Sequence, residues 1–98
     1  MKAVRVQYTV KQDYVETNKK NIQAVMKHLE DNPIAGMWYR AFLLDDGLSF
    51  MHINICDSEE IMSRLNAVEL FMKFRQELRK SEPLSPPKSE NLLMVTPD

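Results

Sequence analysis

Apolar and polar side chains alternate strictly over residues 3–10, AVRVQYTV, near the start of the chain. Val4, Val6, Tyr8 and Val10 fall on one side, and the residues between them, mostly polar, fall on the other. Successive side chains of a strand point to opposite faces of a sheet, so this pattern predicts a half-buried β-strand.

The apolar residues between positions 14 and 30 change to helical spacing. They form one stripe: Val15, Ile22, Val25, Met26 and Leu29. Asp13, with Glu16 three residues later, has the capping-box pattern of a helix start. Asn32-Pro33 ends the predicted helix, because proline disfavours the helical conformation of the residue before it.

Two apolar-rich runs within residues 38–56 are joined by Asp45-Asp46-Gly47, which predicts a β-hairpin. In one register, Asp45 and Asp46 form the middle of a type I turn and Gly47 takes the left-handed conformation. A two-residue Asp46-Gly47 turn gives a register one residue away and changes which side chains share a face.

The first register is favoured because it sorts the side chains of the hairpin into two coherent faces. One face then receives a core set: Tyr39, Ala41, Leu43, Met51, Ile53 and Ile55. The other face has the cross-strand pairs Trp38–Asn54, Arg40–His52 and Phe42–Phe50. This second face is aromatic and polar at once, and the sequence predicts that it meets another molecule.

Asp57-Ser58 followed by two glutamates predicts the start of a second helix, since acidic residues there are favoured by the helix dipole. The second half of its apolar stripe is rotated around the helix axis relative to the first half, which predicts a break near Asn66-Ala67. The proline-rich residues 81–90 are interpreted as a connector, and residues 91–95 as a short last strand. The resulting order, β-α-β-β-α-β, predicts an α+β ferredoxin-like plait with two helices on one face of a four-stranded antiparallel sheet.

Length and composition narrow the class of protein. The 98 residues suffice for a single domain, 1–98, and a net charge of −1 does not favour nucleic acid or anionic lipid as a partner. No apolar run approaches the ~18 residues of a membrane helix, and the N-terminus shows no signal peptide. With a single cysteine and therefore no intrachain disulfide, we expect a cytoplasmic, soluble protein.

Candidate chemistry is sparse. His28, His52 and Cys56 lack the spacing of metal ligands, and two glycines cannot make a phosphate-binding loop, so neither a metal nor a cofactor is expected. His52 beside Arg40 could be a base or an anion-binding pair, although an interface pair that bonds to a second subunit is the favoured interpretation. We expect a homodimer whose interface contains one set of residues: Trp38, Arg40, Phe42, Phe50 and Asn54.

The second half, FMHINICDSEEIMSRLNAVELFMKFRQEL, resembles the third strand and second helix of the antibiotic biosynthesis monooxygenase-like proteins, the dimeric α+β barrels. Leu65 before the helix break, the Phe71-x-x-Phe74 pair and Pro86-Pro87 carry the likeness. The resemblance implies a homodimer with two sheets face to face and a pocket between each sheet and its own helices. The chain departs from the pattern at Arg64, where many of these proteins have histidine, and it lacks a clear counterpart of the Asn-Trp-His set of haem-degrading relatives.

Three functions follow as hypotheses. The first is a cofactor-independent monooxygenase-like oxidoreductase acting on a small aromatic or quinol-type molecule, with His52 and Tyr39 as catalytic candidates. The expected ligand-binding residues are Tyr8, Tyr39, Met51, Ile53, Phe71 and Phe74. The second is a non-catalytic ligand-binding or assembly protein of the same fold. The third, an RNA-recognition module, is disfavoured because the third strand lacks the basic and aromatic pattern of such modules.

Overall fold

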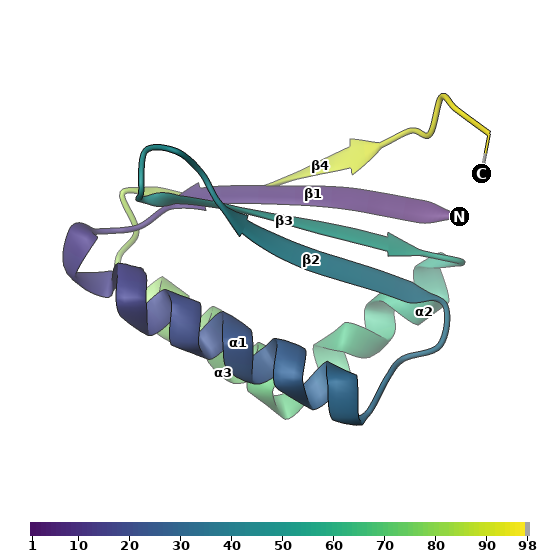
Figure 1. The fold of residues 1–98 in the computed structure, drawn as a ribbon, viewed down its shortest axis with the longest axis horizontal. Coiled ribbons are helices and arrows are strands. Elements are labelled where there is room, and N and C mark those ends of the chain that lie inside the picture. Colours follow the sequence, from purple (N-terminus) through teal and green to yellow (C-terminus); the bar gives the residue numbers. More distant parts are fainter. Residues whose placement is uncertain (98) are drawn as a thin grey trace.

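The computed structural model describes residues 1–97, which form four strands and three α-helices (Figure 1). The elements in chain order are β1 (Lys2–Thr9), η1 (Gln12–Tyr14), α1 (Val15–Asp31), β2 (Met37–Leu43), β3 (Ser49–Cys56), α2 (Glu59–Ser63), η2 (Arg64–Ala67), α3 (Glu69–Lys80) and β4 (Ser85–Leu92), where η marks a 3-10 helix. In the described part of the chain, no helix has the length and apolar character needed to cross a membrane.

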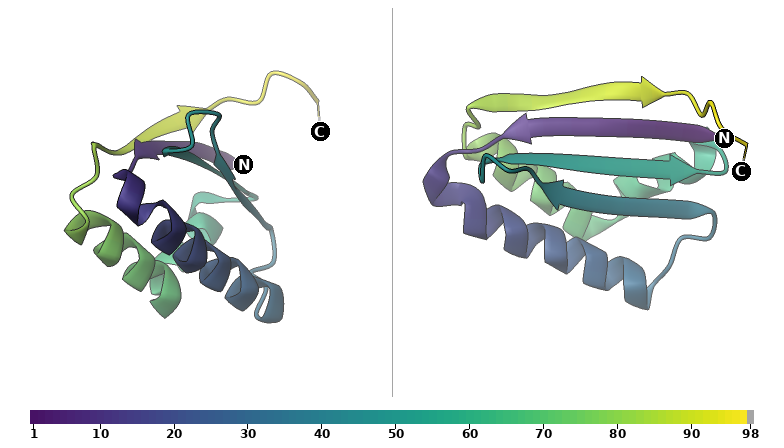
Figure 2. Two further views of the ribbon diagram at one scale, coloured as in Figure 1. Left: turned by 60° about the vertical axis from the view of Figure 1, so that its left-hand side comes forward. Right: turned by 45° about the horizontal axis from the view of Figure 1, so that its top comes forward.

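The strands form one antiparallel sheet in the order β2-β3-β1-β4, and the helices lie together on one of its faces (Figure 2). This arrangement confirms the predicted ferredoxin-like plait. The other face of the sheet is left open. We call it the outer face, and the helix-covered one the inner face.

The hairpin between β2 and β3 has the predicted turn but not the favoured register. The backbone N–H of Gly47 donates to the Leu44 carbonyl at 3.0 Å, and Gly47 has a φ of +72°, as expected for a type I turn around the two aspartates. The loop is one residue longer than expected, because Leu44 N–H donates to the carbonyl of Ser49. The Asp46 carboxylate accepts hydrogen bonds from the backbone of both Leu48 and Ser49, which holds the extra residue in the loop.

The extra loop residue places Ala41 opposite His52, the register that a two-residue turn would also have produced. One residue of slip moves every side chain of a strand to the other face. Phe50, His52 and Asn54 therefore lie on the inner face, and their predicted place on the outer face was wrong. Met51 and Ile53 were predicted to face the core, and this prediction was wrong because both lie on the outer face.

The helix boundaries follow the predicted pattern in part. Ser58 caps α2, since its side chain accepts the backbone N–H of Ile61 at 3.2 Å. The predicted break near Asn66 is confirmed, because η2 separates α2 from α3. The capping box at Asp13 was wrong: η1 leads into α1, whose N-cap residue, Tyr14, makes no side-chain cap.

The last strand begins earlier than predicted. β4 runs over Ser85–Leu92, so it contains most of the segment interpreted as a connector, while residues 93–95 lie beyond its end. Pro86 and Pro87 fall within this strand, whose position at the edge of the sheet tolerates residues that cannot donate a backbone hydrogen bond. The register with β1 also shifts between Gln7 and Thr9, next to these prolines.

The core lies between the inner face and the helices. Its buried members come from every layer: Tyr8, Val10, Ile22, Val25, Tyr39, Phe50, Leu65, Phe74 and Leu78. The α1 stripe predicted from helical spacing supplies Ile22 and Val25, and the second half of the chain supplies Leu65, Phe74 and Leu78. Beneath the sheet, the packing of the described residues leaves a cavity of about 700 Å³.

Candidate functional site

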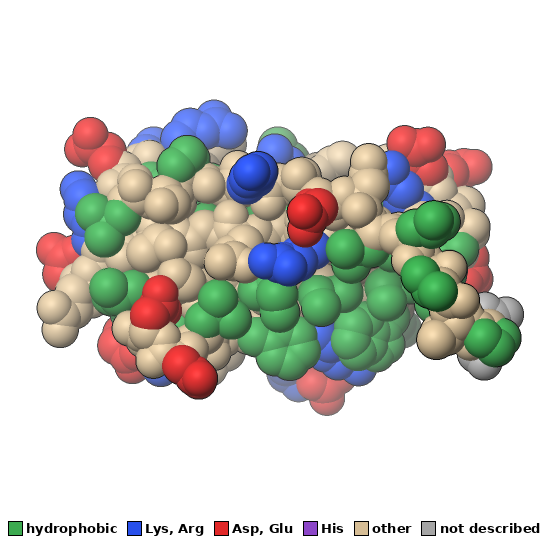
Figure 3. Space-filling view, turned by 90° about the horizontal axis from the view of Figure 1, so that it is seen from above, with side chains coloured by type: hydrophobic (Ala, Val, Ile, Leu, Met, Phe, Trp, Pro, Cys, Tyr) green, Lys and Arg blue, Asp and Glu red, His purple; other side chains and the backbone are tan. Residues whose placement is uncertain are grey.

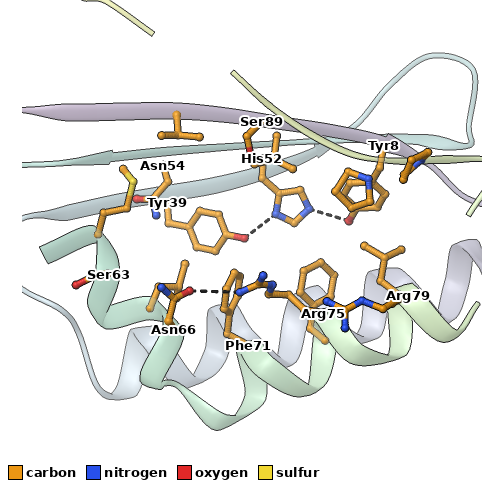
Figure 4. A pocket seen from close by; sticks show the side chains of 18 of the residues that line it. Tyr8, Tyr39, His52, Asn54, Ser63, Asn66, Phe71, Arg75, Arg79 and Ser89 are labelled. Carbon is orange, nitrogen blue, oxygen red and sulfur yellow. Dashed lines mark hydrogen bonds between the residues drawn. The ribbon is translucent and has the colours of Figure 1, made fainter. Parts of the chain in front are cut away.

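A cavity of about 700 Å³ lies between the inner face of the sheet and the segment α2-η2-α3 (Figure 4). Its wall on the sheet side comes from all four strands, and its opposite wall comes from the helices. Most of the lining is apolar or aromatic: Val4, Val6, Tyr8, Tyr39, Met62, Leu65, Phe71, Phe74, Leu78, Pro83, Pro86 and Pro87. A space of this size and lining suits a small, largely apolar ligand.

A line of hydrogen bonds through His52 crosses the sheet side of this cavity. The Tyr8 hydroxyl lies 2.8 Å from Nε2 of His52, and the Tyr39 hydroxyl lies 2.6 Å from Nδ1 (Figure 4). The register explains the arrangement. Tyr8 is opposite Phe50 and Tyr39 is opposite Asn54, so the two tyrosines are diagonal neighbours of His52 on either side of it.

Asn18 of α1 extends this line away from the cavity. Its side-chain Nδ2 donates to the Tyr8 hydroxyl at 2.9 Å, and the residue is completely buried. Neutral imidazole has one donor and one acceptor nitrogen. If Tyr8, having accepted from Asn18, donates to Nε2, then Nδ1–H donates to Tyr39 and the Tyr39 proton is left for the cavity.

Burial keeps all three titratable members of the line uncharged near neutral pH. Desolvation lowers the pKa of His52 from its ordinary value to about 4, because only 5% of the residue is exposed and no carboxylate among the described residues offsets the cost of an imidazolium. Desolvation also raises the pKa of Tyr8 and of Tyr39 well above the usual tyrosine range. The site is therefore a set of neutral donors and acceptors.

Aromatic rings enclose the imidazole on the helix side. The Phe74 ring stacks on His52 with centroids 5.5 Å apart, and the Phe71 ring meets Tyr39 edge-on at 6.3 Å. Phe71 and Phe74 also contact each other at 6.0 Å. These rings limit the access of water to the polar line, which strengthens each hydrogen bond within it.

The predicted ligand-binding residues divide between the two faces. Tyr8, Tyr39, Phe71 and Phe74 line the cavity together with His52. Met51 and Ile53 were placed there wrongly, because the register turns them to the outer face. Of the predicted interface set, Phe50 and Asn54 are buried on the inner face, whereas three residues are open to solvent on the outer face: Trp38, Arg40 and Phe42.

Asn18 is the site residue that sequence reasoning missed. It occurs four residues before Ile22, on the apolar stripe of α1, and its spacing with Ile22 and Val25 is that of a core position. An amide at a core position needs buried hydrogen-bond partners, which is the signal that could have identified it.

The described residues offer no centre for a metal ion. Among positions 1–97, no group of three or more histidine, cysteine or acidic side chains comes together. Cys56 is buried, and its Sγ donates to Asn54 Oδ1 at 3.2 Å. Burial, with the charge of Asp57 nearby, raises the pKa of this thiol and makes it a weak nucleophile.

No protein-family model matches the sequence, and no curated protein matches it either. Solved structures do match the fold. An antibiotic biosynthesis monooxygenase superposes with a TM-score of 0.83 at 13% identity, over 98% of this chain and 100% of the other. Rv0793 from Mycobacterium tuberculosis gives 0.82 at 12% identity, over 98% and 96% of the two chains. SnoaB, a cofactor-independent oxygenase from Streptomyces nogalater, gives 0.74 at 13% identity, over 98% and 94%.

This chain has the antibiotic biosynthesis monooxygenase fold. The superpositions cover nearly the whole chain, so the resemblance noticed in the second half of the sequence extends to all four strands and the helices. Identities of 12–13% establish the monooxygenase fold and leave the chemistry to be argued from the residues of this cavity.

Proposed function

We propose that this protein is a cofactor-independent monooxygenase-like enzyme that binds a small phenol- or quinol-type molecule in the cavity. The observation that carries the proposal is the Tyr8–His52–Tyr39 line, a set of polar groups joined within 2.8 Å along one wall of an apolar space. Such a wall can hold the oxygen of an aromatic ring while the remaining walls hold the ring itself.

The reaction needs no reductant beyond its substrate. A phenol with an open ring position and O2 give a quinone and water. One oxygen atom enters the ring, and the other leaves as water with two hydrogens of the substrate. The substrate loses four electrons and O2 gains them. The task left to a protein is to favour the electron-rich phenolate and to keep the reacting ring dry.

Tyr39 and His52 are the residues to which we assign this task. The Tyr39 hydroxyl lines the cavity and accepts from Nδ1–H of His52, so its own proton is free to donate to the phenolate oxygen. The phenol proton would pass to Nε2 of His52, the unprotonated nitrogen, by way of the Tyr8 hydroxyl, which also lines the cavity. A bound phenolate would in turn favour the imidazolium by charge attraction and raise the pKa of His52 from about 4. Phe71 and Phe74 would exclude water from the ring.

We also propose that the protein is a homodimer that pairs through the outer face. Trp38 and Phe42 are 43% and 45% exposed, and the outer face shows a continuous apolar area beside charged side chains (Figure 3). The guanidinium of Arg40 lies 4.8 Å from the centre of the Trp38 ring. Met51 and Ile53 lie on the same face and add to its apolar surface. A contiguous exposed apolar patch of this kind is typical of an interface between proteins.

A non-catalytic ligand-binding or assembly protein is the second candidate, and the His52 environment favours it. A pKa of about 4 makes the imidazole a weak base toward a phenol, since a general base works best when its pKa is near the working pH. In a non-catalytic protein, the hydrogen-bonded Tyr8–His52–Tyr39 line would orient a bound molecule without transferring a proton.

Oxygen uptake with 1-naphthol as the probe tests both candidates. An enzyme should consume O2 and form 1,4-naphthoquinone in equal amounts, with one atom of labelled oxygen in the product. Tyr39→Phe should lower the rate about a hundredfold. Tyr14→Phe is the matched control, because its hydroxyl has no partner within residues 1–97 and is not part of the cavity lining.

The outcomes separate the candidates. Calorimetric binding of 1-naphthol without oxygen uptake would replace the enzyme with the binding protein. Absence of both binding and uptake would contradict a phenol site in this cavity. Equal rates for Tyr39→Phe and the unaltered protein would remove Tyr39 from the proposed mechanism.

A further inference from the structure

The charged side chains that line the cavity are mostly cationic. Lys2, Arg75 and Arg79 contribute positive charge, and among residues 1–97 Glu59 is the sole acidic residue of the lining. His52 is neutral, since its pKa is lowered to about 4 by burial. The lining thus has a net charge of about +2 near neutral pH, in a chain whose net charge is −1.

The two arginines occupy one side of α3, four residues apart. Residues with this spacing are neighbours on a helix surface, so both guanidinium groups can reach one ligand. Arg75 and Arg79 are both exposed and both line the cavity, which places them where the cavity meets solvent. Figure 4 shows them on α3, across the cavity from His52 and the tyrosines.

Arg75 is held in place without being neutralised. Its Nη1 donates to Oδ1 of Asn66 at 3.3 Å, and its guanidinium lies 5.7 Å from the centre of the Phe71 ring. These contacts orient the group but use one of its five N–H donors. Within residues 1–97, neither Arg75 nor Arg79 has a carboxylate at salt-bridge distance.

We propose that Arg75 and Arg79 form a binding site for the carboxylate of an aromatic acid whose ring occupies the cavity. The inference deepens the proposed function, because it uses the same cavity and names the class of its ligand. A planar guanidinium matches a carboxylate through two parallel hydrogen bonds, and such charge-assisted bonds are about twice as strong as neutral ones. Phe71 beneath Arg75 and the tyrosine line opposite would hold the ring and its oxygen.

Four matched probes test the inference by calorimetry: 6-hydroxy-2-naphthoic acid, its methyl ester, and the 6-methoxy analogue of each. The acid should bind about tenfold more tightly than its ester, and added salt should reduce the difference. In the double variant Arg75→Gln/Arg79→Gln, the acid should lose this advantage while the ester binds as before. Lys73→Gln is the control, since this cation of α3 is not part of the lining.

The probes distinguish this inference from the proposed function. Equal affinity for acid and ester, or an acid preference that survives in the double variant, would overturn the carboxylate site while leaving a phenol cavity intact. Absence of binding for every probe, in a protein whose circular dichroism is unchanged, would overturn both. If Lys73→Gln lost the preference for the acid to the same extent, the preference would come from the overall charge of α3. That result would overturn the inference.

Discussion

His52 owes its properties to its surroundings in the fold. Its imidazole is buried on the inner face, contacts the ring of Phe74, and hydrogen-bonds to two tyrosines at its two nitrogens. None of these partners carries a charge, so nothing compensates the loss of solvation that an imidazolium would suffer. His52 is therefore an uncharged imidazole near neutral pH. Two measurements can test its protonation, one through its pKa and one through its tautomer.

The first is the dependence of stability on pH. The unfolded chain binds a proton at His52 near pH 6.5 and the folded chain near pH 4, so between these values the unfolded state binds more protons. The free energy of unfolding should therefore fall as the pH is lowered from about 6.5 to about 4, by roughly 3 kcal/mol from this residue. Urea unfolding of the unaltered protein and of His52→Gln at pH 7 and pH 4 isolates the contribution. Equal losses in both would show that His52 is not desolvated.

The second is the tautomer of the imidazole. Donation from Asn18 to Tyr8 favours a His52 that carries its proton on Nδ1 and donates it to Tyr39. The nitrogen chemical shifts of the ring, measured by NMR at pH 7, report which nitrogen is protonated. In Asn18→Leu the constraint is absent, and we expect the protonated fraction of Nδ1 to fall. A ring protonated at Nε2 in the unaltered protein would contradict this assignment, because His52 would then donate to Tyr8 and accept from Tyr39.

At the scale of elements, the loop between β2 and β3 decides the faces of the hairpin. Gly47 holds the left-handed conformation, and a Cβ built there would meet nothing within 4 Å. Any cost of a side chain at this position is therefore conformational and involves no clash. Leu48 is the additional loop residue, held by the Asp46 carboxylate.

Gly47→Ala should destabilise the protein by about 1 kcal/mol, because alanine is strained at positive φ. Gly47→Asn should cost less, since asparagine adopts this conformation more readily than other residues. Thermal unfolding of the three proteins measures the difference. A melting temperature unchanged by alanine would contradict the left-handed turn.

At the scale of the whole molecule, the open question is what covers the outer face. Helices cover only the inner face, and the outer one exposes Trp38 and Phe42. Two copies related by a two-fold axis would bury the same surface on each, which is the simplest self-complementary arrangement.

Sedimentation at micromolar concentration should therefore give twice the chain mass of 11.5 kDa. The double variant Trp38→Glu/Phe42→Glu should sediment as a monomer, because paired faces would bury like charges. Met72→Glu should remain a dimer, since this exposed apolar residue belongs to α3 and lies away from the sheet. A monomer in the unaltered protein would contradict the homodimer.

The order of the elements, the plait and the aromatic residues of the cavity could be predicted from the sequence. Alternation in β1 and helical spacing in the helices are local, so Tyr8, Phe71 and Phe74 were assigned to the inner side of the fold without knowledge of their partners. The break at η2 was equally visible, because a change in the phase of an apolar stripe is a local signal.

Tertiary structure alone decided the surroundings of His52. Side chains of a strand alternate with period two, so one additional residue in the loop at Leu48 turns Phe50, His52 and Asn54 inward and Met51 and Ile53 outward. The local pattern of the hairpin favours the other register, in which His52 lies on the outer face. The choice depends on the burial of Phe50 against Tyr8 and on the bonds of His52 to Tyr8 and Tyr39, contacts between strands far apart in the chain.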